Sequence, residues 1–224
     1  MNISLLFALL AGAILVWWLL VQRLRTKPWL EQGIIEEQGA VNAPAPRVGL
    51  RVFLAVVTSL FVLFAMVYSM RSEFPDWRPL PDPSLLWINT GLLILGSVAL
   101  QLARGAAARD DLAGLKRNLT AGGVLTIAFL VGQLIAWRQL TTAGYYMATN
   151  PADAFFYILT GLHGLHMLGG LWFWGRASLA VWKGLEKSTM IEVSGVRLRV
   201  QLCSVYWHYL LLIWLALFSL LLST

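Results

Sequence analysis

Residues 202–222 read LCSVYWHYLLLIWLALFSLLL, a run of 21 residues without a charged side chain. A helix of about 20 apolar residues spans the hydrocarbon core of a bilayer, which is about 30 Å thick. The run is too long and too uniformly apolar for an outer-membrane barrel strand, in which apolar and polar residues alternate over about ten positions. It therefore predicts a transmembrane helix and places the chain among the all-α membrane proteins.

The composition extends this conclusion to the whole chain. Of 224 residues, 58% are hydrophobic and 12% are charged, whereas soluble domains carry about 25% charged residues. So little charge cannot cover a globular surface, which excludes a soluble domain, a disordered chain and a nucleic-acid-binding module despite the net charge of +6. Cys203 is the only cysteine in the sequence, so neither a disulfide nor a cysteine-based metal site can form within the chain.

Five further apolar runs are long enough to cross a membrane, at residues 5–21, 52–70, 85–103, 119–137 and 154–175. The sequence therefore predicts a polytopic membrane helix bundle with six transmembrane helices. The first run is longer than a typical signal-peptide core, and its basic residues follow the run instead of preceding it, which favours a retained helix. Four prolines after the second run predict a rigid, non-helical cap at 74–84: Pro75, Pro79, Pro81 and Pro83.

A segment containing Pro44 and Pro46 separates the first run from the other five. We therefore divide the chain into residues 1–49, an N-terminal transmembrane helix with a cytoplasmic linker, and residues 50–224, a bundle of five helices. The connecting segments 22–51, 104–118 and 176–201 hold 14 of the 17 lysines and arginines. Because basic residues accumulate on the cytoplasmic side, this distribution predicts that both termini lie outside (N-out/C-out).

The apolar runs contain no Lys, Arg, Asp or Glu, because all of these residues lie in the segments between them. Intramembrane charges usually mark ion pathways and proton relays. Their absence from the runs disfavours an ion-coupled transporter, a channel or the proton-pumping core of a larger enzyme.

The three histidines, His163, His166 and His208, all lie in apolar runs. A neutral imidazole in lipid needs hydrogen-bond partners, so we expect all three to face the bundle. Three interpretations remain open: hydrogen bonds between helices, to partners such as Thr160, Gln133 or Tyr206; a haem held by His166 and His208; or a metal site. Near the first two histidines, Gly164 and the pair Gly169–Gly170 predict close approach of a neighbouring backbone.

Two motifs on the last two runs resemble those of a known family. Residues 160–166 read TGLHGLH and are followed by Gly169 and Gly170, and residues 207–215 read WHYLLLIWL. They are similar to the TGxHGxH…G and WHFVDxVWL signatures of subunit III of haem–copper cytochrome c oxidases, and the similarity to short bacterial members extends over residues 50–222. The motif residues are His163, Gly164, His166, Gly170, Trp207, His208 and Trp214.

The resemblance implies an accessory subunit of a respiratory haem–copper oxidase in the bacterial cytoplasmic (inner) membrane. It implies no catalytic residue, cofactor or metal in this chain, because haem and copper would lie in the partner subunits I and II. The motif residues would be structural, the chain would pack against subunit I, and it would bind phospholipids. Arg51 and Arg176 are candidates to contact lipid phosphates, and their alternative role is plain anchoring at the inner membrane surface.

Three departures from the family pattern limit what the resemblance implies. Where the family pattern has an acidic residue in its last helix, this chain has Leu211, and at a second acidic position it has Ala136. The family's third acidic residue, a glutamate, has no counterpart in the region of Leu60 and Phe61. A proton-collecting role for such carboxylates cannot come from these positions. Two alternatives stay open beside the oxidase subunit: a subunit III-like protein associated with nitric oxide reductase, and a small cytochrome b ligated by His166 and His208.

Overall fold

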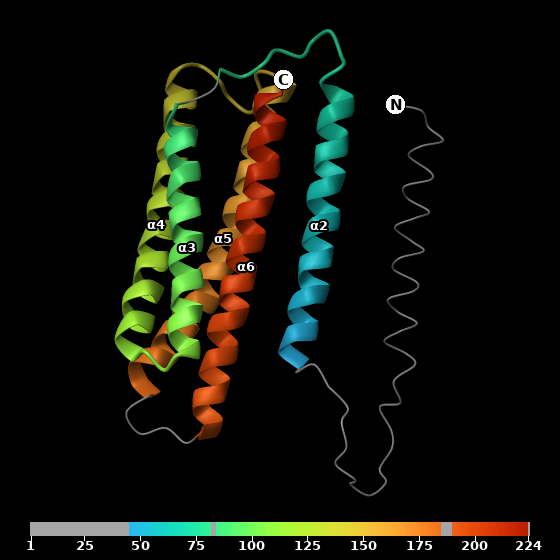
Figure 1. The fold of residues 1–224 in the computed structure, drawn as a ribbon. Helices are drawn as coiled ribbons and strands as arrows, with labels where there is room; N and C mark the ends of the chain where they lie inside the picture. The colour runs from blue at the N-terminus through green and yellow to red at the C-terminus, as the bar shows by residue number, and fades with distance from the viewer. Residues whose placement is uncertain (1–44, 82–83, 185–189, 224) are drawn as a thin grey trace, which may run out of the picture. The chain divides into compact units, whose positions relative to one another are not determined.

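The computed structural model describes residues 45–81, 84–184 and 190–223, which fold into five α-helices (Figure 1). The helices are α2 (Ala45–Arg71), α3 (Leu85–Ala108), α4 (Leu112–Thr142), α5 (Pro151–Gly184) and α6 (Met190–Leu222). All five are long and apolar enough to cross a membrane. The predicted all-α class is confirmed for these residues, and five of the six predicted spans lie in helices. The predicted span at residues 5–21 lies outside the described residues.

All five described helices continue beyond their apolar runs. The sequence identified residues 104–118 and 176–201 only as connections, yet much of both segments is helical. In the first, α3 continues to Ala108 and α4 begins at Leu112; in the second, α5 continues to Gly184 and α6 begins at Met190. Val181 and Val200 are both 1% exposed and belong to the main core. The apolar run therefore measures the membrane crossing, whereas packing between neighbouring helices sets the helix length.

A tight turn joins α3 to α4. Asp110 adopts a left-handed backbone conformation with φ of 59°, which short polar residues tolerate better than most others. Asp111 is the N-cap of α4, and its carboxylate accepts a hydrogen bond from the Gly114 N–H at 2.9 Å. The carboxylate of Asp110 pairs with Arg197 in the N-terminal part of α6, so the turn also contacts a helix that is distant in the sequence.

The segment between α2 and α3 contains turns and no helix over residues 72–81, as its prolines predicted. Arg71 forms an ion pair with Asp76, and the Arg71 guanidinium lies 5.0 Å from the centroid of the Phe74 ring. The Asn150 side chain, just before α5, donates a hydrogen bond to the Arg78 carbonyl at 2.5 Å. These contacts hold the segment against the N-terminal end of α5.

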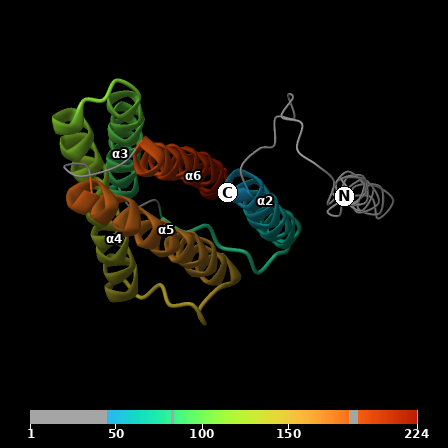
Figure 2. The same ribbon diagram turned by 90° about the horizontal axis from the view of Figure 1, so that it is seen from below.

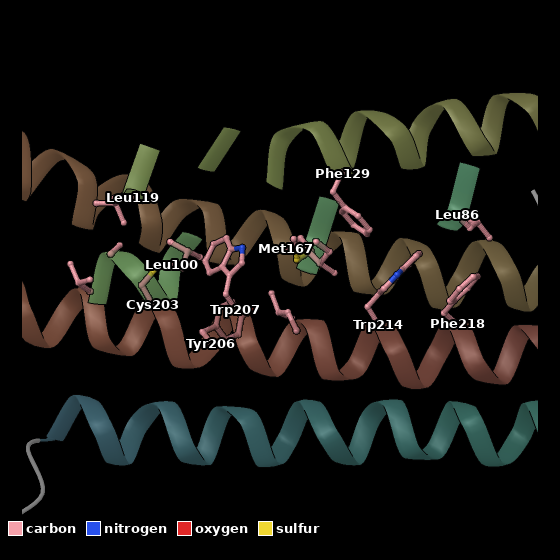
Figure 3. Close-up of a cluster of buried hydrophobic side chains, with 14 of the residues drawn as sticks. Leu86, Leu100, Leu119, Phe129, Met167, Cys203, Tyr206, Trp207, Trp214 and Phe218 are labelled. Carbon is pink, nitrogen blue, oxygen red and sulfur yellow. The ribbon is translucent and has the colours of Figure 1, made fainter. Parts of the chain in front are cut away.

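The helices α3 and α4 form an antiparallel hairpin, with α6 packed against α3 and α5 packed against both α4 and α6. Of the described helices, α2 contacts only α5 and α6. Figure 2 shows α5 and α6 between α2 and the α3–α4 hairpin. The main core lies between α3, α4, α5 and α6 (Figure 3), and a smaller cluster attaches α2 through Val57, Phe61, Leu159, Ile213 and Leu217.

Candidate functional site

The motif histidine His163 lies at the point where four helices meet. Its side chain is fully buried, and its ring centroid lies 5.3 Å from Trp214 on α6, 6.0 Å from Phe129 on α4 and 6.4 Å from Phe61 on α2. These three rings surround the imidazole, and we call the four residues the histidine box. The box joins the two sequence motifs, because it brings His163 of the first against Trp214 of the second.

Neither ring nitrogen of His163 has a hydrogen-bond partner within the described part of the chain. The predicted hydrogen bonds from this histidine to Thr160, Gln133 or Tyr206 are therefore wrong. Thr160 instead accepts from the indole N–H of Trp137 at 3.0 Å, and Tyr206 donates to the backbone carbonyl of His166 at 2.9 Å. The geometry assigns His163 a packing role inside the box.

The other two histidines each bond to their own helix. The Nδ1 atom of His166 lies 2.8 Å from the Leu162 carbonyl, and that of His208 lies 2.7 Å from the Ser204 carbonyl. His166 is half-buried, whereas His208 is exposed. The expectation that all three histidines face the bundle is therefore wrong for His208. A backbone carbonyl one turn earlier satisfies one of its ring nitrogens, so that nitrogen does not require a partner from another helix.

The structure does not bring His166 and His208 onto facing surfaces. His166 contacts Phe53 and Phe61 of α2, with ring centroids at 6.3 and 5.5 Å, and its carbonyl accepts from Tyr206. Tyr206 and His208 are two residues apart, which places them about 200° apart around α6. His208 therefore points away from the side of α6 that contacts His166, so this geometry does not favour a haem held between the two histidines.

Three tryptophan–threonine pairs connect the helices through one repeated arrangement, which we call the Trp–Thr relay. In each relay an indole N–H donates to a threonine hydroxyl on another helix, at 2.8 to 3.0 Å. The same hydroxyl donates to the carbonyl four residues earlier in its own helix. The pairs are Trp207 with Thr126, Trp214 with Thr90, and Trp137 with Thr160. Both motif tryptophans thus fasten α6 to the α3–α4 hairpin, and Figure 3 shows both pointing into the core.

The motif glycines have different surroundings. A Cβ atom on Gly170 would lie 2.7 Å from the ring of Tyr206 and 2.9 Å from the ring of Trp207, so the absence of a side chain lets these α6 aromatics pack against α5. At Gly164 and Gly169 a Cβ would meet nothing within 4 Å. The predicted close approach of a backbone is wrong at these two positions, and at Gly170 side chains approach instead of a backbone.

The histidine box and each of the relays contain at least one residue of the two sequence motifs. Comparison with known proteins identifies the family of these motifs. The family described as "Cytochrome c oxidase subunit III" matches residues 77–222, which include all of α3, α4, α5 and α6. This chain belongs to the cytochrome c oxidase subunit III family. The resemblance seen in the motifs is therefore confirmed.

Several bacterial relatives of this subunit III family are similar over most of their length. "Cytochrome c oxidase subunit 3" of Thermostichus vulcanus is 31% identical over 209 residues, which cover 85% of this chain and 96% of the relative. "Probable cytochrome c oxidase subunit 3" of Mycobacterium tuberculosis is 32% identical over 177 residues, covering 77% of this chain and 84% of the relative. "Cytochrome c oxidase subunit 3" of Corynebacterium diphtheriae is 32% identical over 188 residues, which cover 80% of this chain and 88% of the relative.

Sequence reasoning missed the partners of the motif residues. In the sequence, Thr90 and Thr126 appear only as polar residues within apolar runs, and Phe129 appears only as one residue of an apolar run. Thr90 lies 124 positions from its donor Trp214, and Thr126 lies 81 positions from its donor Trp207. No spacing rule links residues so far apart, so the sequence carried no signal for these pairs. Nor does the sequence reveal that Trp174 donates to the Leu119 carbonyl at 2.9 Å.

A second buried polar pair lies between α3 and α4. The Asn89 side-chain nitrogen donates to Gln133 Oε1 at 3.4 Å, and the two side chains are 0% and 4% exposed. A Cβ on Gly132 would lie 2.1 Å from Asn89 Oδ1, so this glycine makes room for the amide. Gln133 thus accepts its hydrogen bond from α3 rather than from a histidine, while Gln133 Nε2 and Asn89 Oδ1 have no hydrogen-bond partner among the described residues.

The charged residues lie at the ends of this subunit III bundle. Arg51 on α2 and Arg176 on α5 are exposed. On the opposite side, the hydrogen bond from the Arg71 guanidinium holds the pKa of Asp76 below its usual value. Among the described residues, no group of three or more His, Cys, Asp or Glu side chains is arranged to hold a metal ion.

Proposed function

We propose that this chain is the accessory, non-redox subunit III of a respiratory haem–copper terminal oxidase in a bacterial inner membrane. In this role it packs against subunit I of a core that also contains subunit II, and it stabilises that core during aerobic electron transport. Haem and copper belong to the partner subunits. Support comes from the family and from the relatives, which carry the name cytochrome c oxidase subunit 3.

One structural observation carries the proposal: the family motifs are used for holding helices together. His163 and Trp214 form the buried histidine box, and Trp207 and Trp214 donate to threonines of the α3–α4 hairpin. These residues build a rigid scaffold, and their ring nitrogens point into the protein instead of toward a reacting group. A scaffold whose outer surface is apolar is suited to supporting a larger membrane complex.

Phospholipid binding and membrane orientation are further parts of the proposal. Arg51 and Arg176 are exposed and lie on the side that holds most of the basic residues, so they can form charge-assisted hydrogen bonds to lipid phosphates. Replacing both with glutamine should lower the amount of phospholipid that copurifies with the complex, measured by mass spectrometry. If the phospholipid content is unchanged, the two arginines do not bind lipid phosphates and serve only to anchor the helix ends at the membrane surface. The N-out/C-out topology and the first transmembrane helix remain predictions.

The deciding experiment is purification of the tagged chain from native membranes, with a visible absorption spectrum of the product. We expect haem bands and peptides of oxidase subunits I and II. A deletion strain should retain oxidase activity that decays faster during turnover than in the parent strain. A colourless product, or a haem partner identified as nitric oxide reductase, would contradict the proposal, as would oxidase of unchanged stability in the deletion strain.

A further inference from the structure

The outward face of α6 carries polar groups that continue onto α3. The Ser204 hydroxyl donates to the side-chain oxygen of Gln101 on α3 at 3.3 Å, and the Ser204 carbonyl lies 2.7 Å from Nδ1 of His208. Ser204 is buried, whereas Gln101 and His208 are exposed. We call these three residues the α3–α6 polar group. It presents a carboxamide and an imidazole on a bundle surface that is largely apolar.

The α3–α6 polar group lies deep in the hydrocarbon layer. The apolar part of α6 spans Gly195–Leu222 and that of α3 spans Leu85–Ala108, and His208 lies within one residue of the middle of the first. With a rise of 1.5 Å per residue, Ser204 and Gln101 each lie about 7 Å from the middle of their own helices, on the inner side. The two depths agree, as the hydrogen bond between these residues requires. All three residues therefore lie within about 15 Å of the midplane, which is the half-thickness of the hydrocarbon core.

Both exposed side chains retain unused hydrogen-bonding atoms. The Nε2 atoms of Gln101 and His208 have no partner in the described part of the chain. Other exposed polar residues at similar depth differ in this respect, since the hydroxyls of Thr58 and Ser59 donate to carbonyls of their own helix. Lipid tails offer neither donors nor acceptors, so a bare carboxamide or imidazole nitrogen is costly there.

The α4 and α5 surfaces provide an internal comparison. Every exposed residue in 121–137 of α4 and in 154–171 of α5 is apolar. Leu134 and Leu165, for example, are 60% and 63% exposed. Such faces suit contact with lipid tails. The difference in polarity at equal depth separates a lipid-facing side of the bundle from a side that faces protein.

We propose that the outward face of α6, with the adjoining edge of α3, docks a transmembrane helix of the oxidase core that offers a hydrogen-bonding side chain to His208 and Gln101. This inference rests on the proposed function. The exposed α6 residues Val205, His208, Leu212 and Leu215 are spaced by three and four positions, the pattern that packs against a neighbouring helix at a shallow crossing angle. Polar side chains between membrane helices hydrogen-bond across such contacts.

Photo-crosslinking at matched positions tests this docking face. Leu212, one turn from His208, and Leu134, on the lipid-facing side, are 62% and 60% exposed. Each is replaced in turn by p-benzoylphenylalanine in the full chain, and native membranes are irradiated before the tagged chain is purified. We expect the Leu212 variant to crosslink to a subunit of the catalytic core and the Leu134 variant to crosslink to no protein. Equal crosslinking at both positions, no protein crosslink at Leu212, or a crosslink from Leu212 to a second copy of this chain would overturn the inference.

Substitutions at the polar group provide a second measurement. His208→Leu and Gln101→Leu should each lower the retention of this chain in the detergent-purified complex about threefold, and the double variant about eightfold, the factors expected for interhelical hydrogen bonds in membranes. His208→Gln should restore part of the retention because it keeps a hydrogen-bonding group. Leu134→Met is the matched control and should have no effect, and circular dichroism of each variant checks that the helices remain folded.

The outcomes separate this inference from the proposed function. If oxidase subunits copurify with the unmodified chain but the leucine variants are retained normally, the docking face is wrong and the proposed function stands. If no oxidase subunit copurifies with the unmodified chain, the proposed function and the docking face fail together.

Discussion

The Trp–Thr relay between Trp207 and Thr126 makes a sharp prediction about stability. The two side chains are 0% and 1% exposed, and the indole N–H donates to the threonine hydroxyl at 2.8 Å. Thr126→Val replaces the hydroxyl by a methyl group and keeps the branched shape of the side chain. The indole N–H then stays buried without an acceptor, because water and lipid headgroups cannot reach it.

The expected cost follows from two contributions. An interhelical hydrogen bond in a membrane protein contributes about 0.6–1.7 kcal/mol, and leaving a buried donor unsatisfied costs about 1–3 kcal/mol. These overlap, so we expect Thr126→Val to lower the free energy of unfolding by about 1–3 kcal/mol. Thr126→Ser keeps the acceptor and removes one methyl group, which should cost about 0.8 kcal/mol.

A double-mutant cycle isolates the bond itself. Trp207→Phe removes the N–H donor, so the loss in the double variant with Thr126→Val should fall short of the sum of the single losses by about 1–2 kcal/mol. The matched control combines Thr126→Val with Trp214→Phe, which share no hydrogen bond and should add without coupling. Unfolding in mixed micelles with increasing SDS is followed by circular dichroism, since 11 tryptophans make fluorescence unspecific. A coupling below about 0.3 kcal/mol, or a serine variant as unstable as the valine variant, would refute this account of the relay.

Three further predictions concern other parts of the bundle. Gly170→Ala should destabilise the fold by about 1–3 kcal/mol, because the new methyl group meets the aromatic rings of α6. Gly164→Ala, whose methyl group would meet nothing within 4 Å, should be neutral or stabilise the helix by up to about 1 kcal/mol. Equal melting temperatures of the two variants would contradict this. Arg71→Gln should return the lowered pKa of Asp76 toward its usual value in a carboxyl NMR titration, and in the parent the contribution of this pair should be present above the usual Asp pKa and vanish as the pH falls through the lowered one. Ala136→Glu should cost more than about 3 kcal/mol, because this position is 0% exposed and a carboxylate there would be an uncompensated buried charge. A variant that melts like the parent would show that the core can accept an acidic residue at this position.

The membrane class and most of the helices followed from local properties of the sequence. An apolar run of about 20 residues predicts a crossing wherever it occurs, and five such runs lie in helices of the structure. Helix length was less accessible, since α6 begins at Met190, well before its apolar run at residue 202. Val200 lies in that extension and is buried by packing between helices, which hydropathy does not register.

The site illustrates the same division. The motifs pointed to His163, Trp207 and Trp214, and each of them is buried in the core. His208 has the same residue type as His163 and also lies in an apolar run, yet one is exposed and the other enclosed. Their difference arises from the angle each side chain takes around its helix relative to neighbouring helices, which is a property of the assembled bundle.

By itself, the sequence determined that this is an all-α membrane protein with charge confined to the segments between its apolar runs, and its motifs indicated the subunit III family. These properties depend on residues that are adjacent or a few positions apart. Only the tertiary structure decided which threonine accepts from which tryptophan, which histidine is enclosed, and that Gln101 meets Ser204 across 103 positions. Such pairings depend on the rotation of each helix about its axis and on its position against its neighbours. Contacts between residues far apart in the sequence determine both, and these contacts exist only in the assembled bundle.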